Sequence, residues 1–303
     1  MRDFPGERTL PAFMRPTFSI ITPSFRQLDW LKLCAASIAD QAGVRVEHLV
    51  QDAGSGETML AWAAEWKRKC ETEDGRFSFQ LAMEKDDGMY DAVNRGLRRA
   101  SGELLAYLNC DEQYLPGALA TVADYFAKNP AVDVAFAHAV VVDAQGGFRC
   151  CRKAIPPGRL HTWVSGNLAT LTCATFFRRK VLDEHALFFD PTKRAIGDGV
   201  WVMGMLEKNI RPGIVPALTS AFVDDGRNLM LSPEAVREQR ALVASAPAWA
   251  RAARAAIIAH YRARKWWHGA YRQEPLDYAI YTAASPDERV VFPVEKPSFR
   301  WVR

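Results

Sequence analysis

Polar and acidic residues gather in two neighbouring segments of the chain, and their types suit metal and diphosphate chemistry. Residues 85–97 read as a polar loop followed by the start of a helix. Residues 107–112 end in Asp111 and Glu112 after an apolar run. A carboxylate at the exposed end of a strand can hold a divalent cation, and that cation can hold a diphosphate. The two segments therefore predict a polar site at one edge of a sheet.

The elements that position these residues alternate between strand and helix. Strand patterns cover residues 18–22, 46–51, 77–83 and 103–108, and helical patterns cover residues 28–39, 58–70 and 89–97. In the last helix Met89, Val93 and Leu97 recur every fourth residue. Short apolar strands between helices are typical of an α/β domain whose mainly parallel sheet is covered on both faces.

Polar clusters follow the strands of this predicted sheet. They comprise residues 23–25, Asp52, residues 86–87 and residues 111–112. Ligands of such sheets lie beyond the carboxyl ends of the strands. Four clusters at four strand ends are stronger support for a binding site than any one of them.

The pattern changes after Asp133. Residues 134–143 and 148–152 predict a hairpin around a glycine pair. Strands are expected over 170–177 and 214–223, and Asp198 precedes an apolar helix over 200–206. The chain is helical from Ser232 and irregular after Gly269. We predict an arm over 1–16, a domain over 17–228 that divides at residue 112, and a helical extension over 229–303.

The composition narrows the class of protein. Of the 303 residues, 49% are hydrophobic and 24% charged, as in ordinary globular domains. A net charge of +4 is weak for this length and argues against a nucleic-acid partner. The six cysteines lack CxxC spacing, so we expect reduced thiols and no zinc site. Without a signal peptide pattern or an apolar run of about 20 residues, a cytoplasmic protein is expected.

The chain resembles an inverting family 2 glycosyltransferase with the A-type glycosyltransferase fold, and most closely the bacterial branch that builds capsules, exopolysaccharides and lipopolysaccharide O-chains. The matching segments are 18–25 (FSIITPSF), 50–55 (VQDAGS), 87–96 (DGMYDAVNRG), 100–103 (ASGE) and 107–112 (YLNCDE). Weaker matches are 174–179 (ATFFRR) and 197–201 (GDGVW). The resemblance covers residues 17–228. It implies a Rossmann-like domain in which residues 17–112 bind a nucleotide sugar and residues 113–228 an acceptor.

The sequence departs from the family pattern at three places. The acidic loop ends in Asp111-Glu112 where the family usually has two aspartates, and Asn109 stands where an aspartate is frequent. Thr172-Cys173 replaces a histidine-glutamine pair.

The resemblance assigns metal and catalytic roles to three acidic residues. Asp111 and Glu112 are expected to bind Mn²⁺ or Mg²⁺, because hard cations prefer carboxylate oxygens. The alternative for Asp111 is a loop aspartate that caps a turn. Asp198 is the expected general base, since inverting transfer needs one group to remove the acceptor hydroxyl proton. Its alternative is a helix N-cap.

A second group of residues is expected to bind the donor nucleotide. Asp52 can accept hydrogen bonds from a base or a ribose, or it can form an Asx-turn. Phe25 can stack on the base or belong to the core, and Asp87 can line the site or cap a helix. The full set is Thr22, Pro23, Phe25, Asp52, Asp87, Asn94, Asn109 and Cys110.

These assignments predict transfer of a sugar from a nucleotide-diphosphate sugar, preferably UDP-linked, to a glycan or lipid-linked hydroxyl in bacterial surface polysaccharide synthesis. One alternative is a non-catalytic nucleotide-sugar-binding or assembly subunit, and whether the chain forms a homo-oligomer is left open. A sugar-phosphate nucleotidyltransferase is disfavoured. Its glycine-rich basic loop is missing, because residues 22–28 hold only Arg26 and no glycine.

The C-terminal segment has a basic helical face. Arg251, Arg254, Arg262 and Lys265 share it, with tryptophans and alanines elsewhere on the helix. Such a helix can lie on the anionic cytoplasmic face of the inner membrane. The alternative is a helix that docks its alanine face on the preceding domain.

Overall fold

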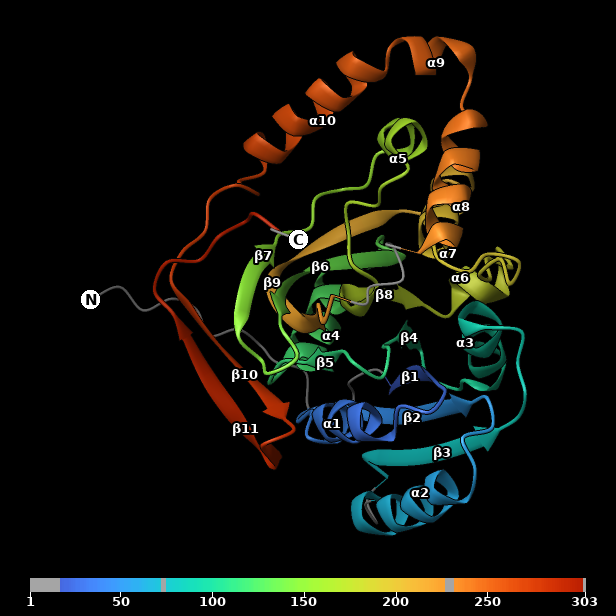
Figure 1. Cartoon of the computed structure of the whole chain (residues 1–303), viewed down its shortest axis with the longest axis vertical. Coiled ribbons are helices and arrows are strands. Elements are labelled where there is room, and N and C mark those ends of the chain that lie inside the picture. Colours follow the sequence, from blue (N-terminus) through green and yellow to red (C-terminus); the bar gives the residue numbers. More distant parts are fainter. Residues whose placement is uncertain (1–16, 72–74, 227–231, 302–303) are drawn as a thin grey trace.

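A mixed sheet of nine strands forms the centre of the computed structural model, which describes residues 17–71, 75–226 and 232–301 (Figure 1). The strand order is β3-β2-β1-β4-β8-β6-β9-β5, and β7 pairs with β6. The strands β1 (Thr17–Ser24), β2 (Arg45–Asp52), β3 (Phe77–Met83), β4 (Leu104–Tyr107), β6 (Val134–Val142) and β9 (Pro212–Val223) run in one direction. The opposite direction is taken by β5 (Gln113–Tyr114), β7 (Phe148–Arg152) and β8 (Thr175–Arg178). The predicted α/β class with a mainly parallel sheet is confirmed.

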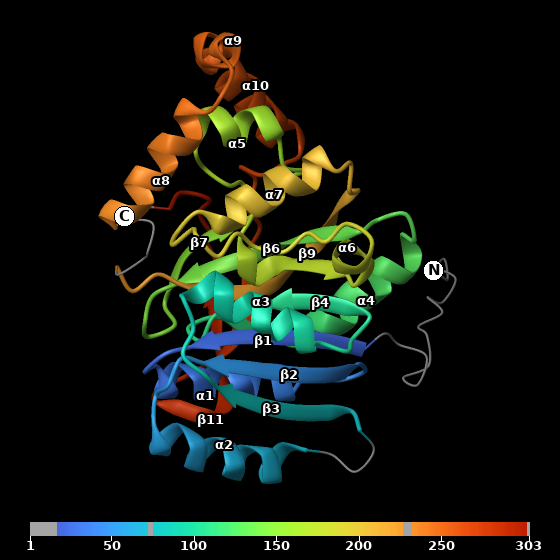
Figure 2. The ribbon, with the colours of Figure 1, turned by 90° about the vertical axis from the view of Figure 1, so that its right-hand side faces the viewer.

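Helices cover both faces of the sheet because successive strand residues point to opposite sides. In β1, Ile20 packs with α1 (Leu28–Ala39), α2 (Glu57–Cys70) and α4 (Ala118–Lys128), whereas Ile21 packs with α3 (Met89–Arg99) and α7 (Gly197–Glu207). Figure 2 shows α3 in front of the strands. Gly96 allows this close packing, because a Cβ at that position would lie 2.5 Å from Ile21.

The connection from β7 to α7 is largely irregular. It contains α5 (Arg159–Ser165), a 3-10 turn over Thr172–Ala174 and α6 (Lys180–Asp183). The hairpin predicted from residues 134–152 is present as β6 and β7. The strand predicted over 170–177 begins only at Thr175, because the 3-10 turn occupies its first half.

The last part of the chain differs from its prediction. Three helices, α8 (Pro233–Ala244), α9 (Ala248–Ala252) and α10 (Arg254–Trp267), are followed by an antiparallel hairpin of β10 (Leu276–Thr282) and β11 (Ser285–Val294). The expectation of an irregular segment after Gly269, and of a purely helical extension, was therefore wrong. The expected arm over residues 1–16 lies outside the described residues.

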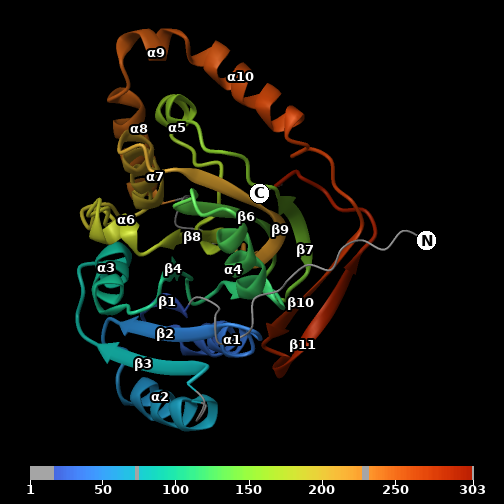
Figure 3. The ribbon, with the colours of Figure 1, turned by 180° about the vertical axis from the view of Figure 1, so that it is seen from behind.

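The hairpin packs back onto the first half of the domain (Figure 3). Arg289 pairs with Asp40 at the end of α1 at 2.5 Å, and the Tyr281 hydroxyl donates to the same carboxylate at 2.9 Å. The Gln113 side chain bonds both the amide and the carbonyl of Tyr281 at 2.8 Å. Residues 276–294 are thus part of the domain that contains the sheet.

Candidate active site

A cleft of about 1540 Å³ lies at the carboxyl ends of the parallel strands. Pockets for one drug-sized ligand occupy roughly 300–1,000 Å³, so this cleft has room for two substrates. Its walls come from the loops after β1, β3, β4 and β9, the starts of α3 and α7, the segment after α5, and Trp301 near the C-terminus. This is the edge of the sheet at which the sequence predicted a binding site.

The loop after β1 forms one end of the cleft. Pro23 and Phe25 line it, and the Phe25 ring is 50% exposed with the Arg26 guanidinium 4.9 Å from its centroid. An exposed ring on a loop is available to stack on a flat ligand. Of the two alternatives for Phe25, the structure shows a surface position and not a core one.

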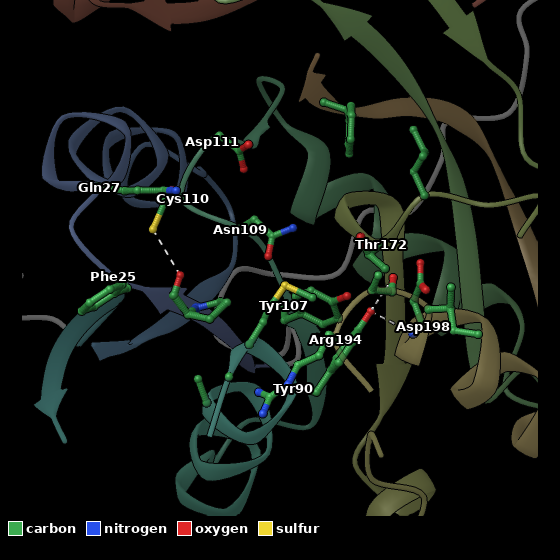
Figure 4. A pocket seen from close by; sticks show the side chains of 18 of the residues that line it. Phe25, Gln27, Tyr90, Tyr107, Asn109, Cys110, Asp111, Thr172, Arg194 and Asp198 are labelled. Atoms are coloured by element: carbon green, nitrogen blue, oxygen red, sulfur yellow. Dashed lines mark hydrogen bonds between the residues drawn. The ribbon is translucent and has the colours of Figure 1, made fainter. Parts of the chain in front are cut away.

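The loop after β4 is tied to the end of β1. The Cys110 thiol donates to the Pro23 carbonyl at 3.2 Å, and burial raises the pKa of this thiol to about 12 (Figure 4). Cys110 is therefore a neutral group that holds two loops together, and both Cys110 and Asn109 line the cleft.

Asp111 and Glu112 take different directions. Asp111 lines the cleft, and burial together with the charge of Asp225 raises the pKa of its carboxyl to about 6. Glu112 is buried beneath the loop, where its carboxylate accepts a hydrogen bond from the Asn109 amide at 2.8 Å. Burial raises the pKa of Glu112 to about 8. The structure contradicts the prediction that Glu112 is a metal ligand in the cleft.

Asp225 is the acidic neighbour of Asp111 that the sequence reasoning missed. It follows β9 and lines the same cleft. Among the described residues no group of three or more His, Cys, Asp or Glu side chains could hold a metal by itself. Two hard carboxylates nevertheless fit Mg²⁺ or Mn²⁺, which usually keep waters and bind substrate phosphates in their remaining positions.

The start of α3 faces the cleft next to Arg194. Asp87 is exposed and lines the cleft, and its carbonyl accepts a hydrogen bond from the Arg194 guanidinium. Gly88 is the N-cap of α3, so Asp87 is not the cap. Gly88 has φ +117°, and a side chain at this position would meet the Arg194 guanidinium. Arg194 places a fixed positive charge in the cleft that the sequence did not indicate.

Three predicted donor-binding residues lie outside the cleft. Asn94 is buried, and its amide bonds the Phe189 backbone in both directions, at 2.7 and 3.0 Å. Thr22 is buried against His48, with 3.0 Å between hydroxyl and ring nitrogen. Asp52 is fully buried and accepts from the Ser55 amide at 2.6 Å and the Ser55 hydroxyl at 2.7 Å. Of the two alternatives for Asp52, the structure shows the turn. All three residues are buried in the protein and do not line the cleft.

Asp198 lines the cleft in the first turn of α7. Ile196 is the N-cap of this helix, so the capping alternative for Asp198 is not observed. Its amide donates to the Tyr90 hydroxyl at 3.2 Å, and its carboxylate accepts from the Gly199 amide at 2.7 Å. Burial raises the pKa of Asp198 to about 6. A base with a pKa near the working pH suits proton abstraction.

Tyr90 positions Asp198 through close contact between α3 and α7. Its ring packs on Gly197, where a Cβ would lie 2.5 Å from the ring. Its hydroxyl donates to the Ala195 carbonyl at 3.3 Å. A larger residue at position 197 would displace the ring and with it the start of α7.

The remaining wall combines side chains distant in sequence. Trp301 stacks edge-on against Phe222 with 5.4 Å between centroids, and its indole N–H donates to the Asp224 carboxylate. The Arg152 guanidinium lies 5.7 Å from the Trp301 ring. All three of Arg152, Phe222 and Trp301 line the cleft. Sequence reasoning did not identify them, because only the fold brings residues 152, 222 and 301 together.

The order of strands, the mixed direction of the sheet and the acidic cleft at its carboxyl edge define an A-type glycosyltransferase fold. Residues 19–186, more than half of the chain, match the family model described as "Glycosyl transferase family 2". The chain belongs to this family, as the sequence motifs predicted.

Curated relatives match part of the chain. An uncharacterized glycosyltransferase of Mycobacterium tuberculosis is 38% identical over 100 residues, which are 33% of this chain and 35% of the relative. A PGL/p-HBAD biosynthesis glycosyltransferase of the same species is 29% identical over 127 residues, 42% of this chain and 48% of the relative. The matches thus span between a third and a half of these relatives.

Solved structures share the fold. Staphylococcus aureus TarS 1–349 in complex with UDP-GlcNAc aligns with a TM-score of 0.58 and 17% identity over 83% of this chain and 73% of that one. The mannosyltransferase PcManGT from Pyrobaculum calidifontis, in complex with GDP-Man and Mn²⁺, aligns with a TM-score of 0.53 and 18% identity over 84% and 78%. At these identities the likeness establishes the fold alone.

Proposed function

We propose that the protein transfers a sugar, with inversion, from a nucleotide-diphosphate sugar, preferably UDP-linked, to a hydroxyl of a glycan or lipid-linked acceptor in bacterial surface polysaccharide synthesis. The observation that carries this proposal is one cleft with Asp111 and Asp198 on separate sides and Asn109 and Tyr107 between them (Figure 4). Inverting transfer requires this arrangement, because the leaving group and the base act on opposite faces of the sugar.

The donor is proposed to bind between the loops after β1, β3 and β4. Phe25 offers a ring for the base, and Arg194 beside Asp87 offers a positive charge for the diphosphate. Asp111 and Asp225 would hold Mn²⁺ or Mg²⁺, which when bound neutralises the leaving diphosphate. The neighbours in complex with UDP-GlcNAc, and with GDP-Man and Mn²⁺, support a donor of this class.

Asp198 is proposed to act on the acceptor. As the acceptor oxygen forms its bond to the anomeric carbon, the bond from that carbon to the diphosphate oxygen breaks, and the hydroxyl proton passes to the Asp198 carboxylate. The Tyr90 hydroxyl fixes the backbone of Asp198. Trp301 and Arg152 form the surface next to which the acceptor would lie, with an aromatic ring suited to the apolar face of a sugar.

A donor screen tests the proposal. Melting temperatures are measured with UDP- and GDP-sugars in the presence of Mn²⁺ or Mg²⁺, and nucleotide release is then followed with candidate acceptors. A donor at 100 times its dissociation constant stabilises by about 2.7 kcal/mol. A shift followed by nucleotide release is expected. The absence of a shift with every donor contradicts the proposal, and a shift without release from any acceptor favours the non-catalytic alternative.

A further inference from the structure

The outer surface of α9 and α10 carries tryptophans where most surface helices carry charges. Trp249, Trp266 and Trp267 are 60%, 71% and 81% exposed. Figures 1 and 2 place α9 and α10 at the edge of the molecule opposite α2. Exposed tryptophans along one edge form an apolar surface, and such surfaces mark sites of interaction with a protein or a membrane.

The apolar side of α10 is the side that faces away from the protein. Its exposed positions at helical spacing are Ala255, Ala256, Ala259, Ala263, Trp266 and Trp267. The other side docks on the segment before and within α5: Tyr261 is buried and stacks on His161 at 3.6 Å, and Arg264 donates to the Pro156 carbonyl at 3.1 Å. The alanine face therefore does not dock on the domain, and it is not needed for the core.

Positive charge surrounds this surface. Residues 239–273 contain seven Arg and Lys residues and no Asp or Glu. Arg262 is exposed beside the alanines and tryptophans. Arg251 and Arg254 are exposed as well, and each also donates to a backbone carbonyl, Arg251 to Ala246 at 2.6 Å and Arg254 to Val164 at 3.0 Å. The basic face predicted from the sequence is thus a margin of the apolar face, and Lys265, half-buried near the Tyr271 ring, turns toward the protein.

We propose that the outer face of α9 and α10 binds the surface of an anionic lipid bilayer. Tryptophans favour the boundary between headgroups and acyl chains, and Arg side chains reach from there to the phosphates. A segment with seven basic residues and no acidic one matches such a surface in charge. Among the described helices, none combines the length and apolar character needed to cross a bilayer, so contact is with the surface.

The contact would bring the cleft close to the membrane. Thr162 of α5 and Gly166 directly after it line the cleft, and α5 packs on α10. A lipid-linked acceptor held in the bilayer would then meet the acceptor side of the cleft. This orientation rests on the proposed function, whereas lipid binding itself does not.

Vesicle flotation tests the surface. The full chain is mixed with vesicles of phosphatidylcholine alone or of phosphatidylcholine with phosphatidylglycerol. We expect binding to the anionic vesicles, weakened by salt, and little binding to the neutral ones. The double variant Trp266→Ser/Trp267→Ser should bind about tenfold more weakly or worse, and Arg262→Gln about fivefold more weakly.

A matched control shows whether vesicle binding depends on the tryptophans of α10 or on exposed apolar side chains anywhere on the protein. Leu60 and Val291 are 49% and 61% exposed on other parts of the molecule, and Leu60→Ser/Val291→Ser should bind vesicles as the unchanged protein does. Melting curves and UDP affinity without lipid show whether each variant is folded. These measurements also distinguish failure of the lipid contact from failure of the proposed function.

Two results would overturn the proposal. One is equal binding of the unchanged protein and the double tryptophan variant to anionic vesicles. The other comes from sedimentation without lipid: a dimer that the double variant converts to a monomer would assign this surface to a second copy of the chain.

Discussion

The two walls of the cleft are built in different ways. The wall proposed to bind the donor, here called the donor wall, consists of loops that directly follow neighbouring parallel strands. It is held by links such as Cys110 to Pro23 between two of these loops and Asp52 to Ser55 within one turn. The opposite wall consists of the start of α7, the end of β9 and a residue near the C-terminus, held by links such as Tyr90 to Asp198 and Trp301 to Asp224.

This difference indicates which wall is free to vary. Loops at the ends of paired strands are fixed by the sheet, so the donor wall is built mainly from residues 17–112, and only Arg194 and Asp225 join it from later segments. The opposite wall depends on contacts of a helix start and of the segment near the C-terminus, such as Trp301 with Asp224, and its side chains can change without disturbing the sheet. We expect changes in the first wall to affect donor binding and changes in the second to affect transfer and acceptor binding.

The largest expected effect is on the second wall. Asp198→Asn should leave donor affinity within a few-fold and lower the transfer rate by about 10²–10⁴, because the proton acceptor is lost. Calorimetry with UDP and a single-turnover rate measure the two quantities. Asp183→Asn on the exposed side of α6 is the matched control. Transfer within a few-fold of the unchanged protein would remove Asp198 from the mechanism.

The next effect separates two neighbours on the first wall. Asp111→Asn should remove the increase in UDP affinity that Mn²⁺ produces, a loss of roughly tenfold to a hundredfold if one charge-assisted contact is worth about 1.5–3 kcal/mol. Glu112→Gln should retain that increase, because Glu112 is buried away from the cleft. Calorimetry with and without Mn²⁺ compares them. If only the Glu112 variant loses the Mn²⁺-dependent increase in UDP affinity, then Glu112 and not Asp111 is the metal ligand.

The pH dependence of transfer should report on Asp198. Since burial raises its pKa to about 6, the carboxylate becomes available as pH rises through this value. The turnover number at saturating substrates should rise and then level off, and at pH about 5 it should be about a tenth of the plateau. A flat profile between pH about 5 and about 7 would show that another group accepts the proton.

The same raised pKa predicts a stability difference. The folded carboxyl holds its proton to higher pH than the unfolded one, so ionisation of Asp198 lowers the free energy of unfolding as pH rises through about 6. Asp198→Asn avoids this cost. It should melt at or above the temperature of the unchanged protein at neutral pH, with a gap that closes as pH falls toward about 4.

A smaller effect is expected at the acceptor surface. Trp301→Ala should raise the KM for the acceptor about threefold to tenfold, because an aromatic contact is worth about 0.5–1.5 kcal/mol. Donor affinity should stay the same. Trp301→Phe keeps a ring and should restore most of the acceptor affinity. An increase in the KM for the donor, with the KM for the acceptor unchanged, would show that Trp301 contacts the donor and not the acceptor.

The donor wall and the sheet could be predicted because their signals are local. Each strand from β1 to β4 is a short apolar run with a polar cluster at its end, and the stripe of Met89, Val93 and Leu97 identified α3. The side chains were harder to orient. Thr22 and Asp52 lie at predicted strand ends but point into the protein, since neighbouring strand residues alternate between faces. Glu112 turns inward because its amide bonds the Asn109 carbonyl in a tight turn.

The opposite wall could be predicted only in part. Asp198 was found through a family motif. Asp225 could have been found as well, because the pair Asp224-Asp225 directly follows the strand predicted over 214–223. Trp301 and Arg194 carry no local signal, because long-range packing puts them in the cleft. The hairpin of β10 and β11 had a signal in the alternation of Leu276, Tyr278 and Ile280, which its charged second strand obscured.

The most direct test is a crystal structure of the full chain with UDP and Mn²⁺, with the manganese located by its anomalous signal. We predict a manganese peak about 2.0–2.6 Å from an Asp111 carboxylate oxygen, the diphosphate beside Arg194, and Asp198 across the remaining space of the cleft. A manganese ion bound elsewhere, or a diphosphate lying against Asp198, would contradict the division of the cleft into a donor wall and a catalytic wall.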